Sequence, residues 1–452
     1  MSSGNGNDLH TEEDKRSLLG LVEQMIAQAM ADGADASQIH VADQIGISAT
    51  ARNRDLEKVE FDRARSFGVR VYVGQSKGVT STSDTSEAAI QEAIRRAIDI
   101  AKYTEPDPYG GLADEDRLAT SFPNLDVYHP QPLNADELIE RAIAVDVAAM
   151  DHSSELIPSD GSAAHAGSTI SVLGNSLGFL QSSASTHYAL YGEAIAQDSQ
   201  GNKQVEGWSS SHCDPSELDP PDSVGVVAAD RALSRLHPQS IKTGKYPVLF
   251  DSSTSRSLFS ALISAISGDM LYLKESYLYD SLGKQVATKE LTLTEYPFLE
   301  NAVGSSAYDR DGVATSEKSF IKDGVVESYA LRTYTGRRLG MPSTGNAGRL
   351  CNLTVESKKT SYRDLIKATG NGIMVTQLKG AGANILTGDY STGIAGYWIE
   401  NGEVAFPIEN VTIAGKLPEI FNQIIGFGDD IDTRRSIRTG STLIESMTVA
   451  AD

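Results

Sequence analysis

The segment Glu105-Pro106-Asp107-Pro108-Tyr109-Gly110-Gly111 constrains the fold more than any other stretch of the sequence. Two prolines and two glycines so close together forbid both the continuation of a helix and a central strand. The chain has 452 residues, which exceeds the size at which one hydrophobic core keeps growing, so two or three domains are expected. We therefore place a linker between domains at this segment.

The residues before the linker predict a small α+β domain that resembles an α/β sandwich and spans 16–105. Apolar residues recur at helical spacing from Ser17 to Ala31 and again from Ile90 to about Lys102, where Asp84 and Glu87 have the spacing of a capping box. Between these helices, residues 56–61 and 67–73 read as strands, the second with strict alternation. Residues 1–15 are rich in Gly, Asn, Asp and Glu, which predicts a disordered tail.

Two further domains are expected after the linker. Residues 125–236 predict a mixed α+β domain, with helices at 135–150 and 223–236 and short strands near 169–173, 179–183 and 187–196. Residues 244–452 are rich in Gly and Thr, and their short strand candidates include 404–407, 411–414 and 442–444. We expect a strand-rich C-terminal domain with few helices, and the α+β class for the whole chain.

The charge balance disfavours two classes of partner. The net charge is −22, from 61 acidic and 39 basic residues, and no Lys/Arg block interrupts it. Binding to nucleic acid or to an anionic membrane depends on clustered basic residues, so neither partner is expected. Two cysteines, Cys213 and Cys351, are too few for a disulfide framework and suit a reducing compartment, where we expect both to be buried. With no signal peptide and no run approaching 18 apolar residues, the expectation is a soluble cytoplasmic protein.

A self-sufficient zinc peptidase site is not expected from the histidines. Such a site needs two His about one helical turn apart, with a Glu beside the first acting as general base. The eight histidines are His10, His40, His129, His152, His165, His187, His212 and His237, and no two of them lie three to five residues apart. The nearest approach to the motif is His152 with Glu155, which lacks the second His.

Three other patterns carry weaker signals. Residues 174–178 match GxSxG and would place Ser176 at a nucleophile elbow, but residues 179–183 read as a strand rather than a helix, which favours a hairpin turn. Residues 370–372 and 380–382 each show GxG without completing a phosphate loop. Asp429, Asp430 and Asp432 lack the ligand spacing of an EF-hand, so a solvated turn is favoured over a Ca²⁺ site.

Several phrases of the sequence resemble the PmbA (TldE) branch of the TldD/PmbA family, which is also described as modulators of DNA gyrase and of microcin processing. In the C-terminal third they are LTGDYSTG from Leu386, GYWIENGE from Gly396, VTIAGKL from Val411 and DIDTR from Asp430. Upstream, residues 69–72, 101–108 and 175–179 match in the same order. The resemblance therefore covers nearly the whole chain.

The resemblance implies a cytoplasmic heterodimer that cleaves unfolded peptides of the microcin or antitoxin type. The TldD-like partner would carry an HExxxH helix, a Cys ligand and a transition metal, expected to be zinc, and the substrate would add as a strand to a sheet edge. In this chain the two His positions fall at Phe259 and Ser264 and the Glu position at Ser260, so no metal ligand, catalytic residue or cofactor is expected here. Candidate peptide-cleft residues are Thr387, Gly388, Asp389, Tyr390 and Ser391.

Two hypotheses follow for the function. In the first, the chain belongs to a hydrolase family but is the non-catalytic subunit, whose helix keeps an apolar stripe of Leu258, Phe259, Leu262, Ile263 and Ile266 for packing. In the second, it is an adaptor or modulator, related to gyrase or to toxin–antitoxin pairs, without a protease role.

Overall fold

The structure is a computed structural model that describes residues 10–380 and 382–451. The chain divides into two compact units, each described by itself below. The first unit contains the chain up to Ala196, Val205–Ala232 and Ala307–Ala314, and the second contains Gln197–Gln204, Leu233–Ser306 and the chain from Thr315 onward. Each unit therefore includes a short segment that the sequence order would assign to the other.

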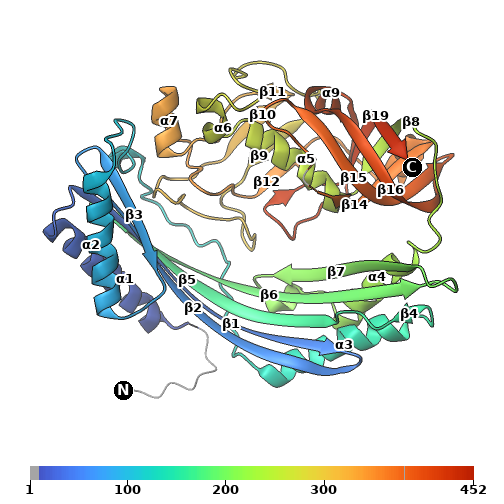
Figure 1. Ribbon diagram of the computed structural model, residues 1–452, viewed down its shortest axis with the longest axis horizontal. Helices are drawn as coiled ribbons and strands as arrows, with labels where there is room; N and C mark the ends of the chain where they lie inside the picture. The colour runs from blue at the N-terminus through green and yellow to red at the C-terminus, as the bar shows by residue number, and fades with distance from the viewer. Residues whose placement is uncertain (1–9, 381, 452) are drawn as a thin grey trace. The chain divides into compact units, whose positions relative to one another are not determined.

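The first unit is a largely antiparallel sheet with helices on one face (Figure 1). Its strands are β1 (Ala36–Arg52), β2 (Asp55–Val73), β3 (Ser76–Thr82), β4 (Leu156–Ile157), β5 (Ser162–Asn175), β6 (Leu180–Gln197) and β7 (Lys203–His212), in the order β3-β2-β1-β5-β6-β4 with β7 also beside β6. Its helices are α1 (Glu12–Ala31), α2 (Glu87–Tyr103), α3 (Ala135–Asp151) and α4 (Pro221–Leu233). The mixed α/β class expected from the sequence is confirmed.

Alternation along β1 builds the two cores of this unit. Ile39 and Val41 are buried in a cluster with residues of α1 and α2, whereas Ile45 and Ile47 are buried in a second cluster with residues of α3. All four are odd-numbered and lie on the same face, because side chains alternate along a strand. The helices therefore cover one face of the sheet at both of its ends.

The chain is ordered earlier than the sequence predicts. Thr11 is the N-cap of α1, where its hydroxyl accepts a hydrogen bond from the Asp14 N–H at 3.2 Å and the Asp14 carboxylate accepts one from the Thr11 N–H at 2.8 Å. The predicted disordered tail over 1–15 is therefore wrong for residues 10–15, while residues 1–9 lie outside the described part. The predicted cap of the second helix also shifts, since Ser86 is the N-cap of α2 and Asp84 accepts from the Ser86 N–H.

Residues of the ordered N-terminus meet a buried charge on β1. Asp43 has a fully buried carboxylate that accepts hydrogen bonds from Arg63 at 3.3 Å and from Arg65 Nε at 3.0 Å. The His10 ring lies 3.7 Å from this carboxylate through Nε2 and hydrogen-bonds Ser168 through Nδ1 at 2.7 Å. Burial alone would raise the pKa of Asp43, but the nearby His10 ring and the hydrogen bonds from Arg65 and Arg63 hold that pKa well below its usual range.

The predicted N-terminal and middle domains share one sheet. β1 pairs with β5 in an unbroken antiparallel register from Gln38↔Asn175 to Ala51↔Ser162. The irregular stretch predicted at 105–111 is confirmed, and the strands predicted at 179–183 and 187–196 are parts of the single strand β6. Domain boundaries at 105 and 125 stay a prediction.

The segment 307–314 is fastened to the first unit by backbone and side-chain contacts. Ala119 N–H donates to the Gly312 carbonyl at 2.9 Å, and Leu118 forms an antiparallel bridge with Val313. Arg70 of β2 pairs with Asp311 at 2.9 Å. These contacts explain why this segment groups with the first unit.

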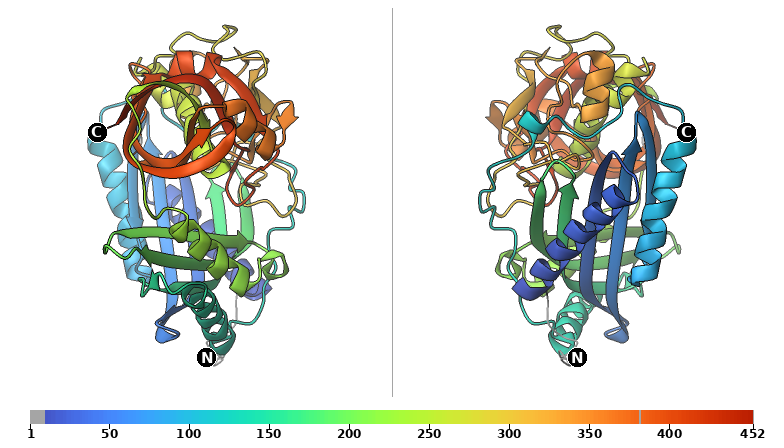
Figure 2. Two further views of the ribbon diagram at one scale, coloured as in Figure 1. Left: turned by 90° about the vertical axis from the view of Figure 1, so that its right-hand side faces the viewer. Right: turned by 90° about the vertical axis from the view of Figure 1, so that its left-hand side faces the viewer.

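The second unit contains a sheet that closes on itself and a smaller sheet. In the first sheet, β8 (Gly244–Phe250) pairs with both β14 (Gly372–Lys379) and β19 (Thr442–Ala451). The ring is completed between these two by β15 (Asp389–Glu400) and β16 (Glu403–Lys416). Outside the ring, β17 (Ile424–Gly428) pairs with β19, and β13 (Lys359–Thr360) pairs with β17. These strands curl into a ring in the left view of Figure 2. The smaller sheet has the order β11-β10-β9-β12-β18, with β9 (Thr292–Glu295), β10 (Lys318–Lys322), β11 (Val325–Val326), β12 (Leu353–Glu356) and β18 (Ile437–Arg438).

Helices of the second unit are short apart from α5 (Ser252–Ala265). The others are α6 (Gly268–Tyr272), α7 (Thr333–Leu339), α8 (Tyr362–Thr369) and α9 (Leu417–Asn422). The strand-rich C-terminal prediction is confirmed, and the strands predicted at 404–407 and 411–414 are parts of β16. Within the described ranges, no helix combines the length and the apolarity needed to cross a membrane.

Candidate functional site

Helix α5 carries the positions that the family resemblance aligns with a metal-binding helix. It begins after Asp251, whose carboxylate accepts from the Thr254 N–H at 2.8 Å and so satisfies a free donor at the helix N-terminus. The predicted apolar stripe is confirmed, since Leu258, Phe259, Leu262, Ile263 and Ile266 are all buried. Its residues belong to the main core cluster of the second unit.

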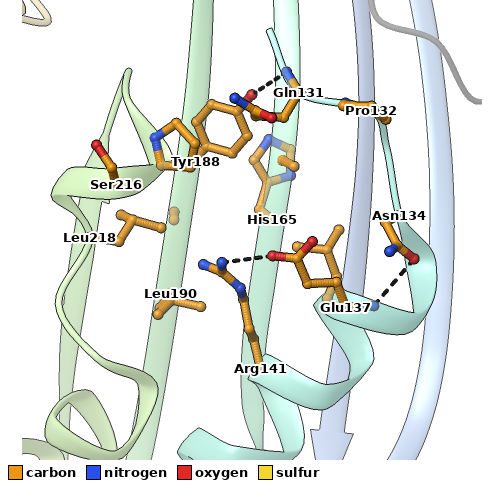
Figure 3. A pocket seen from close by; sticks show the side chains of 14 residues that line it. Gln131, Pro132, Asn134, Glu137, Arg141, His165, Tyr188, Leu190, Ser216 and Leu218 are labelled. Carbon is orange, nitrogen blue, oxygen red and sulfur yellow. Dashed lines mark hydrogen bonds and ion pairs between the residues drawn. The ribbon is translucent and has the colours of Figure 1, made fainter. Parts of the chain in front are cut away.

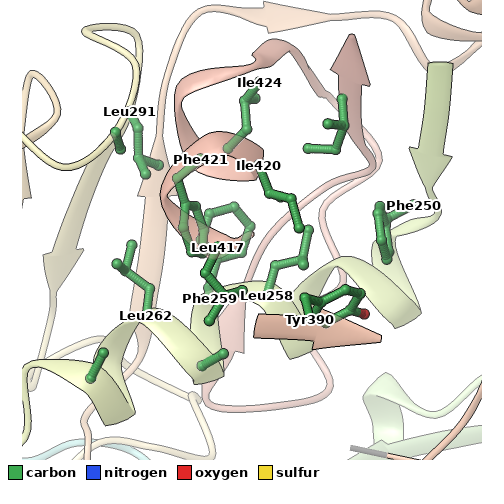
Figure 4. Close-up of a cluster of buried hydrophobic side chains, with 14 of the residues drawn as sticks. Phe250, Leu258, Phe259, Leu262, Leu291, Tyr390, Leu417, Ile420, Phe421 and Ile424 are labelled. Atoms are coloured by element: carbon green, nitrogen blue, oxygen red, sulfur yellow. The ribbon is translucent and has the colours of Figure 1, made fainter. Parts of the chain in front are cut away.

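Phe259, at the first His position, points into this core. Its side chain is 0 % exposed, and its ring lies 6.4 Å from the ring of Phe421 between centroids. Figure 4 shows Phe259 among Leu417, Ile420 and Phe421 of α9. A phenyl ring offers no lone pair to a cation, so this position serves the packing of α5 against α9.

Ser260 and Ser264 lie on a more exposed part of the helix. The Ser264 hydroxyl donates to the Ser260 backbone carbonyl at 2.8 Å, a bond within the helix that occupies the Ser264 side chain. Zinc peptidase sites use imidazole, carboxylate and thiolate ligands, and positions 259, 260 and 264 supply none of these. The residues present do not fit the metal that the family implies, and no group of three or more His, Cys, Asp and Glu in the described ranges is arranged to hold one.

The candidate cleft residues 387–391 form a turn that leads into β15. Asn384 Oδ1 accepts from the Leu386 N–H at 3.1 Å and the Thr387 N–H at 3.2 Å. The Thr387 hydroxyl donates to Asp389 at 2.6 Å, and Lys416 of β16 pairs with the same carboxylate at 2.5 Å. These bonds lower the pKa of Asp389, with the Lys416 contact as the main cause. The turn is therefore held rigidly, with Thr387, Asp389 and Ser391 exposed.

Gly388 and Tyr390 face inward from the same turn. Gly388 has φ of 72°, a conformation that strains other residues, and a Cβ would meet the side chains of Tyr277 and Pro418 at 3.2 and 3.3 Å, so glycine is favoured here. The ring of Tyr390 is 2 % exposed and packs edge-on against Phe250 at 6.5 Å. Burial raises the pKa of Tyr390 to about 12, with the Ser257 hydroxyl acting in the opposite direction. The structure brings the five predicted residues together but divides them into an outer and an inner set.

Both sides of β15 are already occupied next to this turn. Asp389, Tyr390 and Ser391 pair with Lys416, Gly415 and Ala414 of β16, while the Ser391 N–H donates to the Gly382 carbonyl at 2.8 Å. A strand with partners on both sides has no free backbone groups to offer an extended peptide. The turn can contact a peptide only through its exposed side chains.

Other sequence candidates have structural roles. Ser176 lies in the β5–β6 hairpin turn, where its hydroxyl accepts from the Ser37 N–H at 3.1 Å, so the turn interpretation is confirmed. Asp430 accepts from the Ser441 N–H and hydroxyl, whereas Asp432 pairs with Arg434 at 2.9 Å. His152 pairs instead with Asp230 at 2.7 Å. Cys213 and Cys351 are both buried and form no disulfide, as expected.

A cavity in the first unit was not predicted from the sequence. It has a volume of about 370 Å³ and lies between the N-terminal half of α3, strands β5 and β6, and residues 215–218 (Figure 3). Glu137 and Arg141 pair across its wall at 2.7 Å, and the Tyr188 hydroxyl donates to the His129 carbonyl at 2.8 Å. Burial lowers the pKa of His165, which also lines it. Its size suits a small molecule, and two of its polar side chains, Glu137 and Arg141, are paired with each other.

A second feature missed by sequence reasoning is a buried carboxylate in the smaller sheet. Glu295 of β9 is 0 % exposed and accepts from both Asn346 Nδ2, at 3.0 Å, and the Cys351 N–H, at 2.6 Å. Lys318 of β10 pairs with it at 2.5 Å. A buried charge that is this fully bonded orders the loops around it, and its saturation leaves no acceptor for a substrate.

Comparisons with known proteins extend over nearly the whole chain. Three family models match: PmbA/TldA metallopeptidase domain 1 at residues 41–101, the central domain at 128–236 and the C-terminal domain at 243–451. The chain is 37 % identical to Metalloprotease PmbA of Escherichia coli O157:H7, over 95 % of this chain and 96 % of that protein. It is 38 % identical to the Metalloprotease PmbA homolog of Haemophilus influenzae, over 97 % and 99 %.

Solved structures share the fold. A protein of Bacteroides thetaiotaomicron described as a proposed modulator of DNA gyrase matches with a TM-score of 0.91 and 28 % identity, over 98 % of this chain and 100 % of that one. TldE of Thermococcus kodakarensis matches with a TM-score of 0.82 and 20 % identity, over 95 % and 99 %, which supports the fold alone.

Proposed function

The chain belongs to the PmbA/TldD metallopeptidase family, and from this membership we propose that it is the non-catalytic PmbA/TldE-type subunit of a two-subunit metallopeptidase. A TldD-like partner would supply the metal, expected to be zinc, and the reaction. This chain would complete the cleft that holds an unfolded peptide in the cytoplasm.

The observation that carries the proposal is the use of α5. At the positions where the family places its metal-binding residues, the chain has a fully buried phenylalanine and two serines joined by a hydrogen bond within the helix. Placing an imidazole at Phe259 would put a polar ring into an apolar cluster without a hydrogen-bond partner, which costs several kcal/mol. The helix thus contributes stability where a catalytic subunit needs ligands.

The exposed side chains of the 387–391 turn support the role in a cleft. Thr387, Asp389 and Ser391 present hydroxyl and carboxylate groups from a turn whose backbone is bonded to Asn384, while Lys416 holds the Asp389 carboxylate. Fixed polar groups bind a ligand at a lower entropic cost than mobile ones. In this proposal they contact substrate side chains or termini, while the strand edge that takes the peptide backbone belongs elsewhere in the complex.

A reconstituted cleavage assay tests the division of labour. An unstructured peptide is offered to this chain alone, to the TldD-like subunit alone, to both together, and to both after the partner's motif Glu is replaced by Gln. We expect cleavage only with both intact subunits, because each alone lacks either the ligands or half of the binding surface. Chelator-sensitive cleavage by this chain alone would refute the non-catalytic assignment.

The competing hypothesis, an adaptor or modulator without a protease role, gives a different result in the same assay. Full activity of the TldD-like subunit alone would favour it, because this chain would then add nothing to the cleft. Co-purification from native lysate with a tagged chain supplies an independent measurement, and recovery of a TldD-like protein at equal stoichiometry supports the subunit proposal.

A further inference from the structure

The cavity beside α3 has an apolar floor, formed by Leu138, Leu190 and Leu218. Leu138 of α3 and Leu190 of β6 are buried in the core cluster below α3, and Leu218 packs against the same cluster. Ala166 of β5 belongs to that cluster as well, and its small side chain leaves space that a larger one would fill. The cavity of about 370 Å³ is therefore open to a ligand above a continuous apolar surface.

The cavity also has a charged wall, formed by Glu137 and Arg141 on successive turns of α3. Arg141 Nη2 donates to Glu137 Oε1 at 2.7 Å, and Figure 3 shows both charged groups at the cavity. Within the described residues, this is the one bond that either side chain makes. The second Glu137 oxygen and the other N–H groups of the Arg141 guanidinium are therefore available to a ligand.

An ion pair on α2 provides a direct comparison. Glu92 and Arg96 have the same spacing along their helix and the same 2.7 Å separation. The Arg96 side chain is 70 % exposed, whereas the Arg141 side chain is 33 % exposed. A pair of this spacing on an open helix surface adds little beyond local helix stability. Arg141 differs because it is held against the cavity instead of in open solvent.

The charged wall selects the charge of the ligand. A ligand with a carboxylate alone would bind Arg141 beside the like charge of Glu137, and a ligand with an ammonium alone would bind Glu137 beside the guanidinium. A ligand that carries both groups places its carboxylate at Arg141 and its ammonium at Glu137, so that the charges alternate around a closed ring. The wall therefore favours a zwitterion.

The distance within the wall selects the kind of zwitterion. Because the Arg141 and Glu137 groups lie 2.7 Å apart, the two charged groups of the ligand must also lie close together. A free α-amino acid carries both on one α-carbon. In a dipeptide they belong to different residues, whose α-carbons are about 3.8 Å apart. A single amino acid therefore fits the wall better than a peptide does.

The apolar floor selects the side chain of that amino acid. With the charged groups of the ligand at Glu137 and Arg141, its side chain can cover the leucines of the floor. Burying apolar surface favours binding in proportion to the area removed from water, so leucine or phenylalanine gains more than glycine. A charged side chain would be buried there without a partner, which disfavours it.

We propose that this cavity binds a free apolar α-amino acid, with its carboxylate at Arg141, its ammonium at Glu137 and its side chain on the apolar floor. Peptide cleavage releases molecules of this class, and that link alone rests on the proposed function. The binding itself is a property of the first unit of this chain. Its test uses no peptidase activity, so its failure would leave the subunit proposal standing.

Ligand-observed NMR titration of the full chain with L-leucine tests the proposal. We expect one site with a Kd on the order of 0.1–1 mM, as suits so small a ligand. L-leucinamide lacks the carboxylate, N-acetyl-L-leucine lacks the ammonium and glycine lacks the side chain, and each should bind about tenfold more weakly or worse. No binding of leucine up to about 10 mM would overturn the proposal, and so would equal binding of leucine and any of these three analogues.

Two variants of the charged wall locate the site. Arg141→Gln should remove the preference for leucine over leucinamide, and Glu137→Gln should remove the preference for leucine over N-acetyl-leucine, because each deletes the charge that reads one group. A purely structural effect would weaken all ligands equally. Circular dichroism should show the parent fold in both variants, since an exposed pair of this kind contributes little to stability.

The matched controls are Arg96→Gln and Glu92→Gln on α2, which break a pair of the same spacing and separation away from the cavity. Both should bind leucine and its analogues as the parent does. If leucine affinity stays within about twofold of the parent in both wall variants, binding lies elsewhere and the proposed site is wrong.

Discussion

Replacing Phe259 by alanine tests whether α5 serves packing instead of ligation. The side chain is fully buried against Phe421, so its removal leaves a cavity bounded by α9. Removal of a buried Phe typically costs about 3–5 kcal/mol. Phe259→Leu keeps most of the volume and should cost less than about 1.5 kcal/mol, and Ser260→Ala on the exposed side should stay within about 0.5 kcal/mol.

The two tryptophans allow each unit to be followed separately. Trp208 lies in the first unit and Trp398 in the second, and the sequence has no others. In a Trp208→Phe background, the fluorescence of Trp398 reports the urea unfolding of the second unit. With a slope of about 2–3 kcal/mol/M, Phe259→Ala should lower the midpoint by roughly 1–2 M.

The reciprocal background, Trp398→Phe, follows the first unit and should show no shift for Phe259→Ala. A loss below about 1 kcal/mol in the second unit would mean that the ring is not part of a tight core. Position 259 would then not serve the packing of α5. A shift seen equally by both tryptophans would contradict the assignment of the effect to the second unit.

Three further outcomes are expected. The purified chain should retain no stoichiometric zinc or iron after dialysis, because α5 offers no ligands at the three aligned positions; one bound metal ion per chain by elemental analysis would reveal a site elsewhere. Ser176→Ala should leave peptide cleavage by the assembled complex within about threefold, whereas a serine nucleophile would contribute several orders of magnitude. Asp43→Asn should destabilise the first unit by about 3 kcal/mol at neutral pH. Because the folded pKa of Asp43 lies well below the unfolded one, this contribution is fully present above pH 4 and is lost as the pH falls through the folded pKa. The difference between the urea midpoints of parent and variant, followed through Trp208, should therefore narrow progressively below pH 4; a constant difference would contradict this origin.

Local patterns in the sequence predicted the elements that burial decides. The stripe from Leu258 to Ile266 and the alternation from Phe67 to Val73 were read correctly. The spacing of apolar residues along the sequence determines which of them share one face of a helix or strand. The turn at Ser176 was also predictable, since the strand after it leaves no room for the helix of a nucleophile elbow. The start of α1 was missed because its cap, Thr11 with Asp14, lies among polar residues that also suit a tail.

Features that depend on distant pairing could not be predicted. The pairing of β1 with β5 joins residues more than a hundred positions apart, and the sequence of neither strand indicates which strand it pairs with. The same holds for the closing of the ring by β8 and β19, and for the bonds that saturate Glu295. In the candidate cleft, the division of residues 387–391 into outward Thr387 and inward Tyr390 follows from the turn at Asn384, which the sequence motif alone does not reveal.

The placement of residues 307–314 in the first unit has a consequence for synthesis. A ribosome makes the chain from its N-terminus, so the first unit lacks its last segment until Ala314 has been made, 82 residues after Ala232. At roughly 5–20 residues per second this interval lasts about 4–16 s. During that time Leu118 lacks its backbone bridge to Val313, and the Phe179 ring lacks its contact with Tyr308. The nascent first unit therefore lacks these contacts throughout the interval, and a chain truncated after residue 236 would lack them permanently.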